Sequence, residues 1–185
     1  MVKKILIANW KMNINYNQAY SLSKKIFNKI KLLKEKELIL LPSLDAILYI
    51  KNKIYPNLAI FGAQNCSTYI NGAFTGDISA EMIKKIGCKY VLIGHSERRS
   101  LYKEDNNILS KKVLRASEVG LKIIFCVGEN LDDYNCKKSL IKLKLQFKNI
   151  FFQNFNFKNL IIAYEPVWAI GSNKTPKMKE IDAVH

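Results

Sequence analysis

The 185-residue sequence lacks features that several classes of protein require. It has two histidines and four cysteines, and no cysteines at CxxC spacing, so a zinc site is not expected. No run approaches the roughly 20 apolar residues of a membrane span. The apolar run near the N-terminus, ILIANW, is shorter than the roughly 7–15 residues of a signal-peptide core. We therefore expect a cytoplasmic protein with reduced thiols.

Acidic residues are scarce relative to basic ones. The chain has 30 Lys and Arg against 15 Asp and Glu, a formal net charge of +15. Of the 30 basic residues 27 are lysine, and Lys, Asn and Ile together supply 69 of 185 residues, as A+T-rich codons would. The lysines form no dense arm. This pattern favours solvation of helices over nucleic-acid binding, with steering of a phosphate toward a cleft as a second use. No specific nucleic-acid partner is expected.

What the chain does have is an alternation of short apolar runs and helical patterns. Strands are expected at 4–10, 37–41, 58–62, 89–93, 122–127 and 160–163. Helices are expected at 18–35, 45–54, 79–86, 104–119, 132–152 and 177–185. Consecutive parallel strands need helical crossovers, so the alternation predicts an α/β protein with a parallel sheet.

Two architectures fit this alternation, an open doubly wound sheet and a closed barrel. No GxGxxG follows the first strand, which argues against a dinucleotide-binding sheet. Polar residues instead follow several strands: Asn9, Lys11, His95, Glu129 and Glu165. Convergence from many strand ends is typical of a barrel. We predict a TIM (β/α)8 barrel fold, with residues 1–185 forming a single incomplete domain of about six βα units that lacks strands 7 and 8.

The strand-end residues indicate proton transfer next to a carbonyl group. Glu165 ends an apolar strand and precedes an apolar loop, which suits a base held away from water. His95 is expected at a helix N-terminus, where the helix dipole disfavours imidazolium, and Lys11 supplies a positive charge. Glycoside hydrolysis needs a second acid. Glu97 and Glu129 are the candidates, and both are better explained as structural partners of Lys11 or of strand-end backbone.

Seven sequence blocks carry a family resemblance. They are Asn9-Trp-Lys-Met-Asn13, Gly62-Ala-Gln-Asn65, Gly72-Ala-Phe-Thr-Gly76, Ser79-Ala-Glu-Met82, Gly94-His-Ser-Glu-Arg-Arg99, Cys126-Val-Gly-Glu129 and Ala163-Tyr-Glu-Pro-Val-Trp-Ala-Ile-Gly171. In this order and spacing they resemble the triosephosphate isomerase family over nearly the whole chain. The resemblance implies interconversion of dihydroxyacetone phosphate and glyceraldehyde 3-phosphate through an enediol(ate), a step of glycolysis and gluconeogenesis. It implies no cofactor and no metal.

The resemblance also implies a role for each site residue. Glu165 would move the proton, His95 would polarise the carbonyl, and Asn9 and Lys11 would hold the substrate. Residues 166–176 would form a lid.

Within that lid, the Gly171 amide would reach the phosphate. Tyr164 and Glu129 would alternately hold Trp168 as the lid moves, and Glu97 would support the site.

The loop 64–77 resembles the one that enters a neighbouring subunit, which would place Thr75 near the partner's Asn9 and Lys11. A homodimer is therefore implied.

Several positions depart from the family pattern. Asn173 stands where the lid usually has glycine, with positive φ expected there, and Pro176 stiffens the trailing hinge. Asp77 stands where glutamate is usual and is expected to contact Arg98.

The family extends to about 250 residues, the barrel scale. A fragment of a longer product and an eroding gene are both open, and the 185-residue chain alone is expected to be a poor, aggregation-prone catalyst. Turnover within about tenfold of an ordinary isomerase would contradict this. The alternative is an impaired remnant that only binds a partner or RNA.

Overall fold

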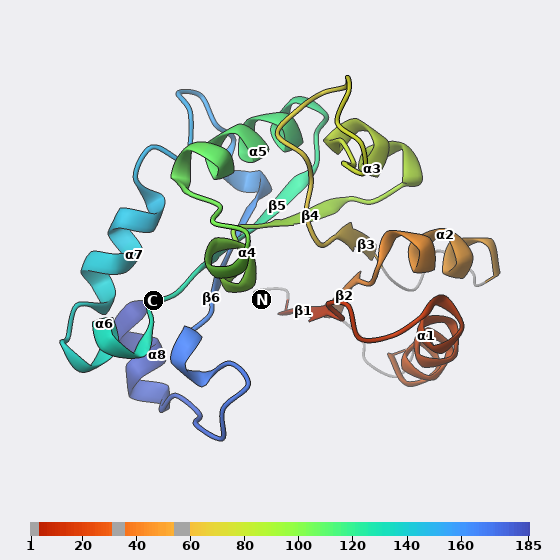
Figure 1. Cartoon of the computed structure of the whole chain (residues 1–185). Coiled ribbons are helices and arrows are strands. Elements are labelled where there is room, and N and C mark those ends of the chain that lie inside the picture. The colour runs from red at the N-terminus through yellow and green to blue at the C-terminus, as the bar shows by residue number, and fades with distance from the viewer. Residues whose placement is uncertain (1–3, 31–35, 54–59) are drawn as a thin grey trace.

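A computed structural model of the chain describes residues 4–30, 36–53 and 60–185. Its strands are β1 (Lys4–Asn9), β2 (Lys36–Leu41), β3 (Ile60–Ala63), β4 (Tyr90–Ile93), β5 (Lys122–Val127) and β6 (Leu160–Tyr164). They form one sheet in chain order, with every neighbouring pair parallel. The sheet curls, and helices lie along its outer side (Figure 1). This confirms the predicted TIM-barrel type of fold with about six βα units.

The helices follow the strands as the alternation predicts, with short helices added. They are α1 (Tyr16–Ile30), α2 (Leu44–Lys53), α3 (Ala80–Ile86), α4 (Ser96–Leu101), α5 (Asn106–Glu118), α6 (Leu131–Asn135), α7 (Ser139–Phe147) and α8 (Met178–Val184), with 3-10 turns η1 (Phe157–Asn159) and η2 (Val167–Ala169). The parts of the predicted elements at 31–35, 54 and 58–59 lie outside the described residues. None of the described helices is long and apolar enough to cross a membrane.

One predicted helix is wrong and another begins later. The single helix expected over 132–152 is two, α6 and α7, because Lys137 has φ 56° in the left-handed region, where a helix cannot continue. The helix expected from Glu104 begins at Asn106, since the Asp105 side chain accepts from the Ile108 amide and caps it.

The core has two layers, one on each face of the sheet. In β5, Ile123, Phe125 and Val127 belong to the layer between the sheet and the helices. Ile124 and Cys126, which alternate with them, belong to a smaller cluster inside the curve. The period of two along one strand therefore fills both layers, as a parallel sheet covered by helices requires.

The apolar runs of the sequence predict six buried strands, and this prediction is wrong at both edges of the sheet. Ile5 and Leu6 of β1 are 40% and 44% exposed, and Ile162 of β6 is 50% exposed, whereas Ile123 and Phe125 of β5 are fully buried. The reason is topological, because β1 and β6 each have a neighbouring strand on one side in the sheet. The strands between the two edges are thus the best buried ones.

Candidate active site

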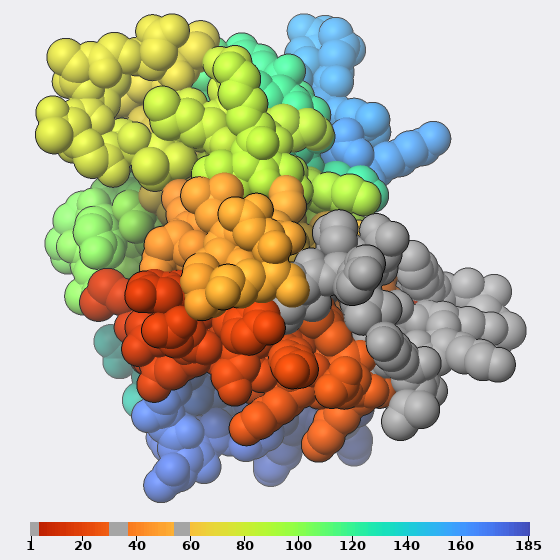
Figure 2. Space-filling model, turned by 90° about the vertical axis from the view of Figure 1, so that its right-hand side faces the viewer, coloured from red at the N-terminus to blue at the C-terminus, as the bar shows by residue number. Residues whose placement is uncertain are grey.

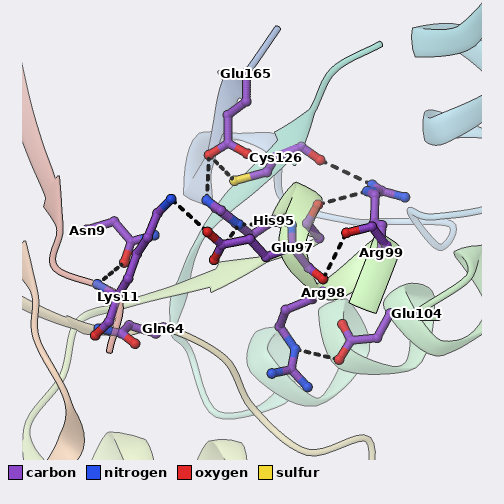
Figure 3. Close-up of polar contacts among 12 residues, drawn as sticks. Asn9, Lys11, Gln64, His95, Glu97, Arg98, Arg99, Glu104, Cys126 and Glu165 are labelled. Atoms are coloured by element: carbon purple, nitrogen blue, oxygen red, sulfur yellow. Dashed lines mark hydrogen bonds and ion pairs between the residues drawn. The ribbon is translucent and has the colours of Figure 1, made fainter. Parts of the chain in front are cut away.

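The predicted site residues leave different strands at the same edge of the sheet. Asn9 ends β1, His95 follows β4, and Glu165 follows β6. Parallel strands bring their carboxyl ends together, so residues far apart in sequence meet here. Figure 3 shows Lys11, Glu97, His95 and Glu165 pointing toward one another.

Lys11 is turned toward the site by an unusual backbone conformation. The sequence left open whether Asn9 and Lys11 point the same way. Lys11 has φ 52°, and its amide donates to Asn9 Oδ1 at 3.0 Å. Gln64 Nε2 donates to the carbonyls of Lys11 (2.9 Å) and Leu41 (2.8 Å). A left-handed residue that its neighbours hold in this way is typical of functional sites. It directs the Lys11 ammonium to Glu97 Oε1 at 2.7 Å.

His95 has its two ring nitrogens assigned to different tasks. The residue is the N-cap of α4, and its Nδ1 accepts the Glu97 amide at 3.2 Å. In a neutral imidazole that accepts at Nδ1, the proton is on Nε2. Nε2 lies 3.4 Å from Glu165 Oε1, and the residue is buried. The structure therefore presents an N–H donor toward the base.

Glu97 is engaged by Lys11, the partner that the sequence suggested for it. The hydrogen bond from Lys11 lowers the pKa of the Glu97 carboxyl; burial opposes this, and His95 and the Lys11 charge add to the lowering. A carboxylate held ionised by a lysine is a poor proton donor. Glu97 is thus a support for Lys11 and does not serve as the second acid of a glycosidase.

Glu165 is fixed by contacts from the end of β5. Its amide donates to the Val127 carbonyl at 2.7 Å, and Cys126 Sγ lies 3.3 Å from its Oε1. Burial raises the pKa of the Cys126 thiol, and Glu165 raises it further, so sulfur stays a neutral donor. A Cβ on Gly128 would lie 1.7 Å from the Glu165 carbonyl oxygen, so this close approach requires glycine. Glu165 Oε2 is buried and has no hydrogen-bond partner among the described residues.

A buried ion pair beside the site was missed by sequence reasoning. Lys112 Nζ contacts Glu104 Oε1 at 2.6 Å and Asn65 Oδ1 at 2.7 Å, and both charged side chains are 5% exposed. Burial lowers the pKa of Lys112, and Glu104 counters that shift. In the sequence Lys112 looks like any helix lysine. The block Gly62–Asn65, which contains the Asn65 that contacts Lys112, is the one signal that could have indicated this pair.

The expected contact between Asp77 and Arg98 is wrong. Arg98 Nε pairs with Glu104 at 2.6 Å, and Asp77 Oδ2 accepts from the Ser67 hydroxyl at 2.6 Å. The aspartate is shorter than glutamate by one methylene and bonds within its own loop.

The segment 166–176, which the resemblance predicts to be a lid, is contacted by a second cluster. Trp168, in η2, donates its indole N–H to Glu129 Oε1 at 2.9 Å, and the Tyr164 hydroxyl donates to the same oxygen at 3.0 Å. Glu129 thus holds Trp168, while Tyr164 holds Glu129. Gly171 and Thr75 lie on exposed loops, apart from these contacts. Gly171 has φ 66°, and the positive φ expected at Asn173 does not occur.

Comparison with known proteins places this geometry in a family. A family model described as triosephosphate isomerase matches residues 4–185. The triosephosphate isomerase of Mesomycoplasma hyopneumoniae (strain 232) is 40% identical over 182 residues, covering 94% of this chain and 73% of the relative. That of Ruthia magnifica subsp. Calyptogena magnifica is 40% identical over 187 residues, covering 100% of this chain and 75% of the relative.

A solved structure agrees with these matches. The crystal structure of triosephosphate isomerase from Bartonella henselae superposes with a TM-score of 0.83 at 33% identity, covering 91% of this chain and 70% of that one. This chain spans about three quarters of the length of the named relatives. With a strand-end glutamate, a histidine donor and a lysine in one cluster, and a family match from residue 4 to 185, the chain belongs to the triosephosphate isomerase family.

Proposed function

We propose that Glu165, His95, Lys11 and Asn9 carry out the reaction of this isomerase family in the present chain. The substrate class is a triose phosphate, and the reaction moves a proton between adjacent carbons. The contact of His95 with Glu165 and the ion pair of Lys11 with Glu97 support this assignment, because a base, a hydrogen-bond donor and a positive charge meet at one sheet edge.

The proposed reaction has two proton transfers at carbon, and both use Glu165. A Glu165 carboxylate oxygen takes the proton from the carbon next to the carbonyl, and the C–H electron pair forms the C=C bond of an enediolate while the carbonyl π pair moves onto oxygen. His95 Nε2–H donates a hydrogen bond to that oxygen, and the Lys11 ammonium offsets its charge. The protonated Glu165 then returns a proton to the neighbouring carbon. The hydroxyl proton on the first carbon passes to the former carbonyl oxygen, which leaves the isomeric carbonyl. Glu165 Oε2, which has no hydrogen-bond partner among the described residues, is the oxygen that accepts the proton from carbon.

The Nδ1 contact of His95 is the observation that carries this mechanism. Because Nδ1 accepts the Glu97 amide, a neutral ring must present Nε2–H to the substrate oxygen. Nitrogen-15 NMR of the His185→Asn variant, which leaves a single imidazole, tests this. We expect the His95 ring to carry a single proton, on Nε2. An imidazolium signal, or a proton on Nδ1, would contradict the mechanism.

The lid completes the proposed site. Residues 166–176 would cover the substrate, with the Gly171 amide donating to the phosphate and the pair Glu129–Trp168 holding the leading end. Exclusion of water by such a cover strengthens the electrostatic contacts of Lys11 and His95.

The remaining part of the proposal is that the chain assembles as a homodimer through the loop 64–77. In Figure 2 the loop 64–77 (yellow) stands out from the body of the molecule. Tyr69 and Ile70 on it are about half exposed, and Tyr69 stacks on Phe74 at 3.6 Å, which stiffens the loop. A hollow of about 370 Å³, lined in part by Gln64, Asn65 and Arg98, could receive the partner's loop.

Analytical ultracentrifugation tests the dimer. The unmodified chain should sediment as a dimer, and Thr75→Arg should shift it to monomer because a charge would enter the interface. Equal sedimentation of both would contradict the proposal.

A cytoplasmic location is also proposed. It is supported by the four free cysteines, of which three are buried.

A further inference from the structure

The side chain of Tyr134 contacts the leading end of the lid segment and the helix that follows its trailing end. Its ring packs on the indole of Trp168, with centroids 4.5 Å apart and planes at 33°. Its hydroxyl donates to Glu180 Oε1 of α8. Trp168 stands near the start of residues 166–176, and α8 begins just after their end. One side chain on α6 therefore connects Trp168, near the start of the lid, with α8, the helix that follows the lid.

Glu180 extends the connection to the backbone at the trailing hinge. Its second oxygen, Oε2, accepts the Lys177 amide at 2.6 Å, one residue beyond Pro176. The hydrogen bond from Tyr134 lowers the pKa of the Glu180 carboxyl, helped by the Lys177 amide, and the same bond raises the pKa of the Tyr134 phenol. The pair thus stays as carboxylate and phenol, which makes the bond charge-assisted.

The contacts of Tyr134 and Glu180 involve none of the residues that the proposed reaction uses. Glu129, which follows β5, accepts the indole N–H of Trp168, and among the described residues it forms no hydrogen bond with α8. Tyr134 is half-buried, so its ring and hydroxyl are positioned by packing on one side while solvent reaches the other. The two lid ends would be tied only loosely to each other without it.

We propose that Tyr134 and Glu180 form a clasp, defined by these two side chains and Trp168, that positions the lid by holding its two ends together. Tyr134 is a positioning residue and touches no substrate. The clasp rests on the proposed function in that residues 166–176 act as a lid. Its loss should let the trailing hinge move without displacing Glu165 or His95, which among the described residues form no hydrogen bond or ion pair with Tyr134 or Glu180.

Limited trypsin digestion of the full chain measures the clasp without relying on catalysis. Lys174 lies in the exposed lid, and its cleavage rate follows the population of the opened segment when opening is fast. Tyr134→Phe keeps the ring and removes the hydroxyl, and Glu180→Gln keeps an acceptor and removes the charge. Each should raise cleavage after Lys174 by about tenfold, the scale of a hydrogen bond to a charged group.

Matched variants and a double mutant decide the outcome. Tyr102→Phe, at an exposed tyrosine, and Asp182→Asn, at an exposed acid of the same helix, should leave the rate within about twofold. Cleavage after the exposed Lys103 should be unchanged in all variants, which excludes global unfolding. The double variant should cleave no faster than the faster single one, since both substitutions act on the same hydrogen bond, one by removing its donor and the other by removing its charge. Rates at Lys174 like those of Tyr102→Phe, or effects that multiply in the double variant, would overturn the clasp.

The kinetic readout separates the clasp from the proposed function. If the lid closes over substrate, Tyr134→Phe should raise KM for the triose phosphate by severalfold and change kcat less, since the chemical groups stay in place. Faster cleavage at Lys174 with unchanged kinetics would leave the clasp standing and contradict the role of 166–176 as a lid. Unchanged cleavage at Lys174 in a chain whose activity depends on Glu165 would overturn the clasp and leave the proposed function standing.

Discussion

The two ends of the sheet differ in how they use charge. At the carboxyl ends, Lys11, Glu97 and Glu165 are bonded within a cluster and partly or fully removed from water. At the amino ends, Lys4, Lys89 and Lys122 stand at or next to the first strand residue and are exposed. Lys89 and Lys122 are neighbours through the bond from the Lys122 amide to the Lys89 carbonyl. The formal charge of +15 is therefore a poor guide to the site, which uses one lysine held by one glutamate.

The difference gives each end a separate expected phenotype. The bonded charges at the carboxyl ends are partly removed from water, which lowers the effective dielectric constant around them, and in the proposed reaction they act on the substrate. Exposed lysines at the amino ends interact through water and salt, and each contributes little. Substitutions at the first end should change turnover or the local fold, and substitutions at the second should change solubility.

The largest effect is expected at Glu165. Glu165→Gln removes the base and should lower kcat by about 10³-fold, the scale of general base catalysis. Glu118→Gln removes an exposed carboxylate that pairs with Arg115 and serves as the control, with kcat within about twofold. Coupled-enzyme assay of triose phosphate turnover measures both against the unmodified chain. Equal losses of kcat in the two variants would show that the carboxylate at the carboxyl ends of the strands has no special role.

The next largest effect is expected from loss of the buried ion pair between Lys112 and Glu104. Lys112→Met leaves the Glu104 carboxylate buried without one of its two cations and should lower the free energy of unfolding by about 3 kcal/mol. The adjacent Lys111 is exposed, so Lys111→Met should cost less than about 0.5 kcal/mol. Urea denaturation followed by circular dichroism provides the comparison. Matching midpoints for the two variants would mean that burial of Lys112 has no energetic consequence.

A matched pair of lysines tests the two ends directly. Lys11→Met should reduce kcat/KM by about 10²-fold, since the charge that offsets the enediolate is lost. Lys122→Met, at the first residue of β5, should leave kcat/KM within about twofold. Steady-state kinetics at fixed ionic strength measures both. A comparable loss for Lys122→Met would assign function to the amino ends.

The smallest effect concerns Tyr90, at the amino end of β4. Its hydroxyl donates to Glu37 Oε1 at 2.9 Å, and burial together with this bond raises the pKa of Tyr90 to about 12. Because the folded-state pKa is raised above the ordinary value of about 10, the stabilisation is full below that pH and is lost as pH rises toward the folded value. Tyr90→Phe should cost about 1 kcal/mol and leave kcat unchanged.

Alkaline denaturation checks the sign of that shift. The unmodified chain should lose stability faster with rising pH than Tyr90→Phe does. Cys66 and Cys88, whose pKa values burial raises to about 12 and about 11, contribute in the same direction to both proteins. Identical pH slopes would show that Tyr90 does not titrate differently in the folded and unfolded states.

Much of this arrangement could be predicted from the sequence because it depends on local signals. Apolar runs place the strands, and the order of strands along the chain becomes the order in the sheet. Glu165, His95 and Lys11 each stand just after a strand, so a shared edge follows from parallel pairing. The division of 132–152 into two helices was missed because its break, at Lys137, carries no glycine or proline.

Other supporting contacts could not be predicted, because they join residues far apart in the chain that no sequence pattern connects. Gln64 holds Lys11 from 53 positions away, and Cys126 contacts Glu165 from 39. A buried lysine such as Lys112 has the same letter as an exposed one such as Lys111. Such contacts become visible once the strands are placed side by side.

Isomerisation in heavy water tests the central claim most directly. If Glu165 moves the proton through an enediolate, product formed from dihydroxyacetone phosphate in D2O should carry solvent deuterium at the carbon that gains the proton. Proton NMR of the product measures this, and the exchange should fall with turnover in Glu165→Gln. Product that retains the substrate hydrogen in full, or undiminished exchange in Glu165→Gln, would contradict the account.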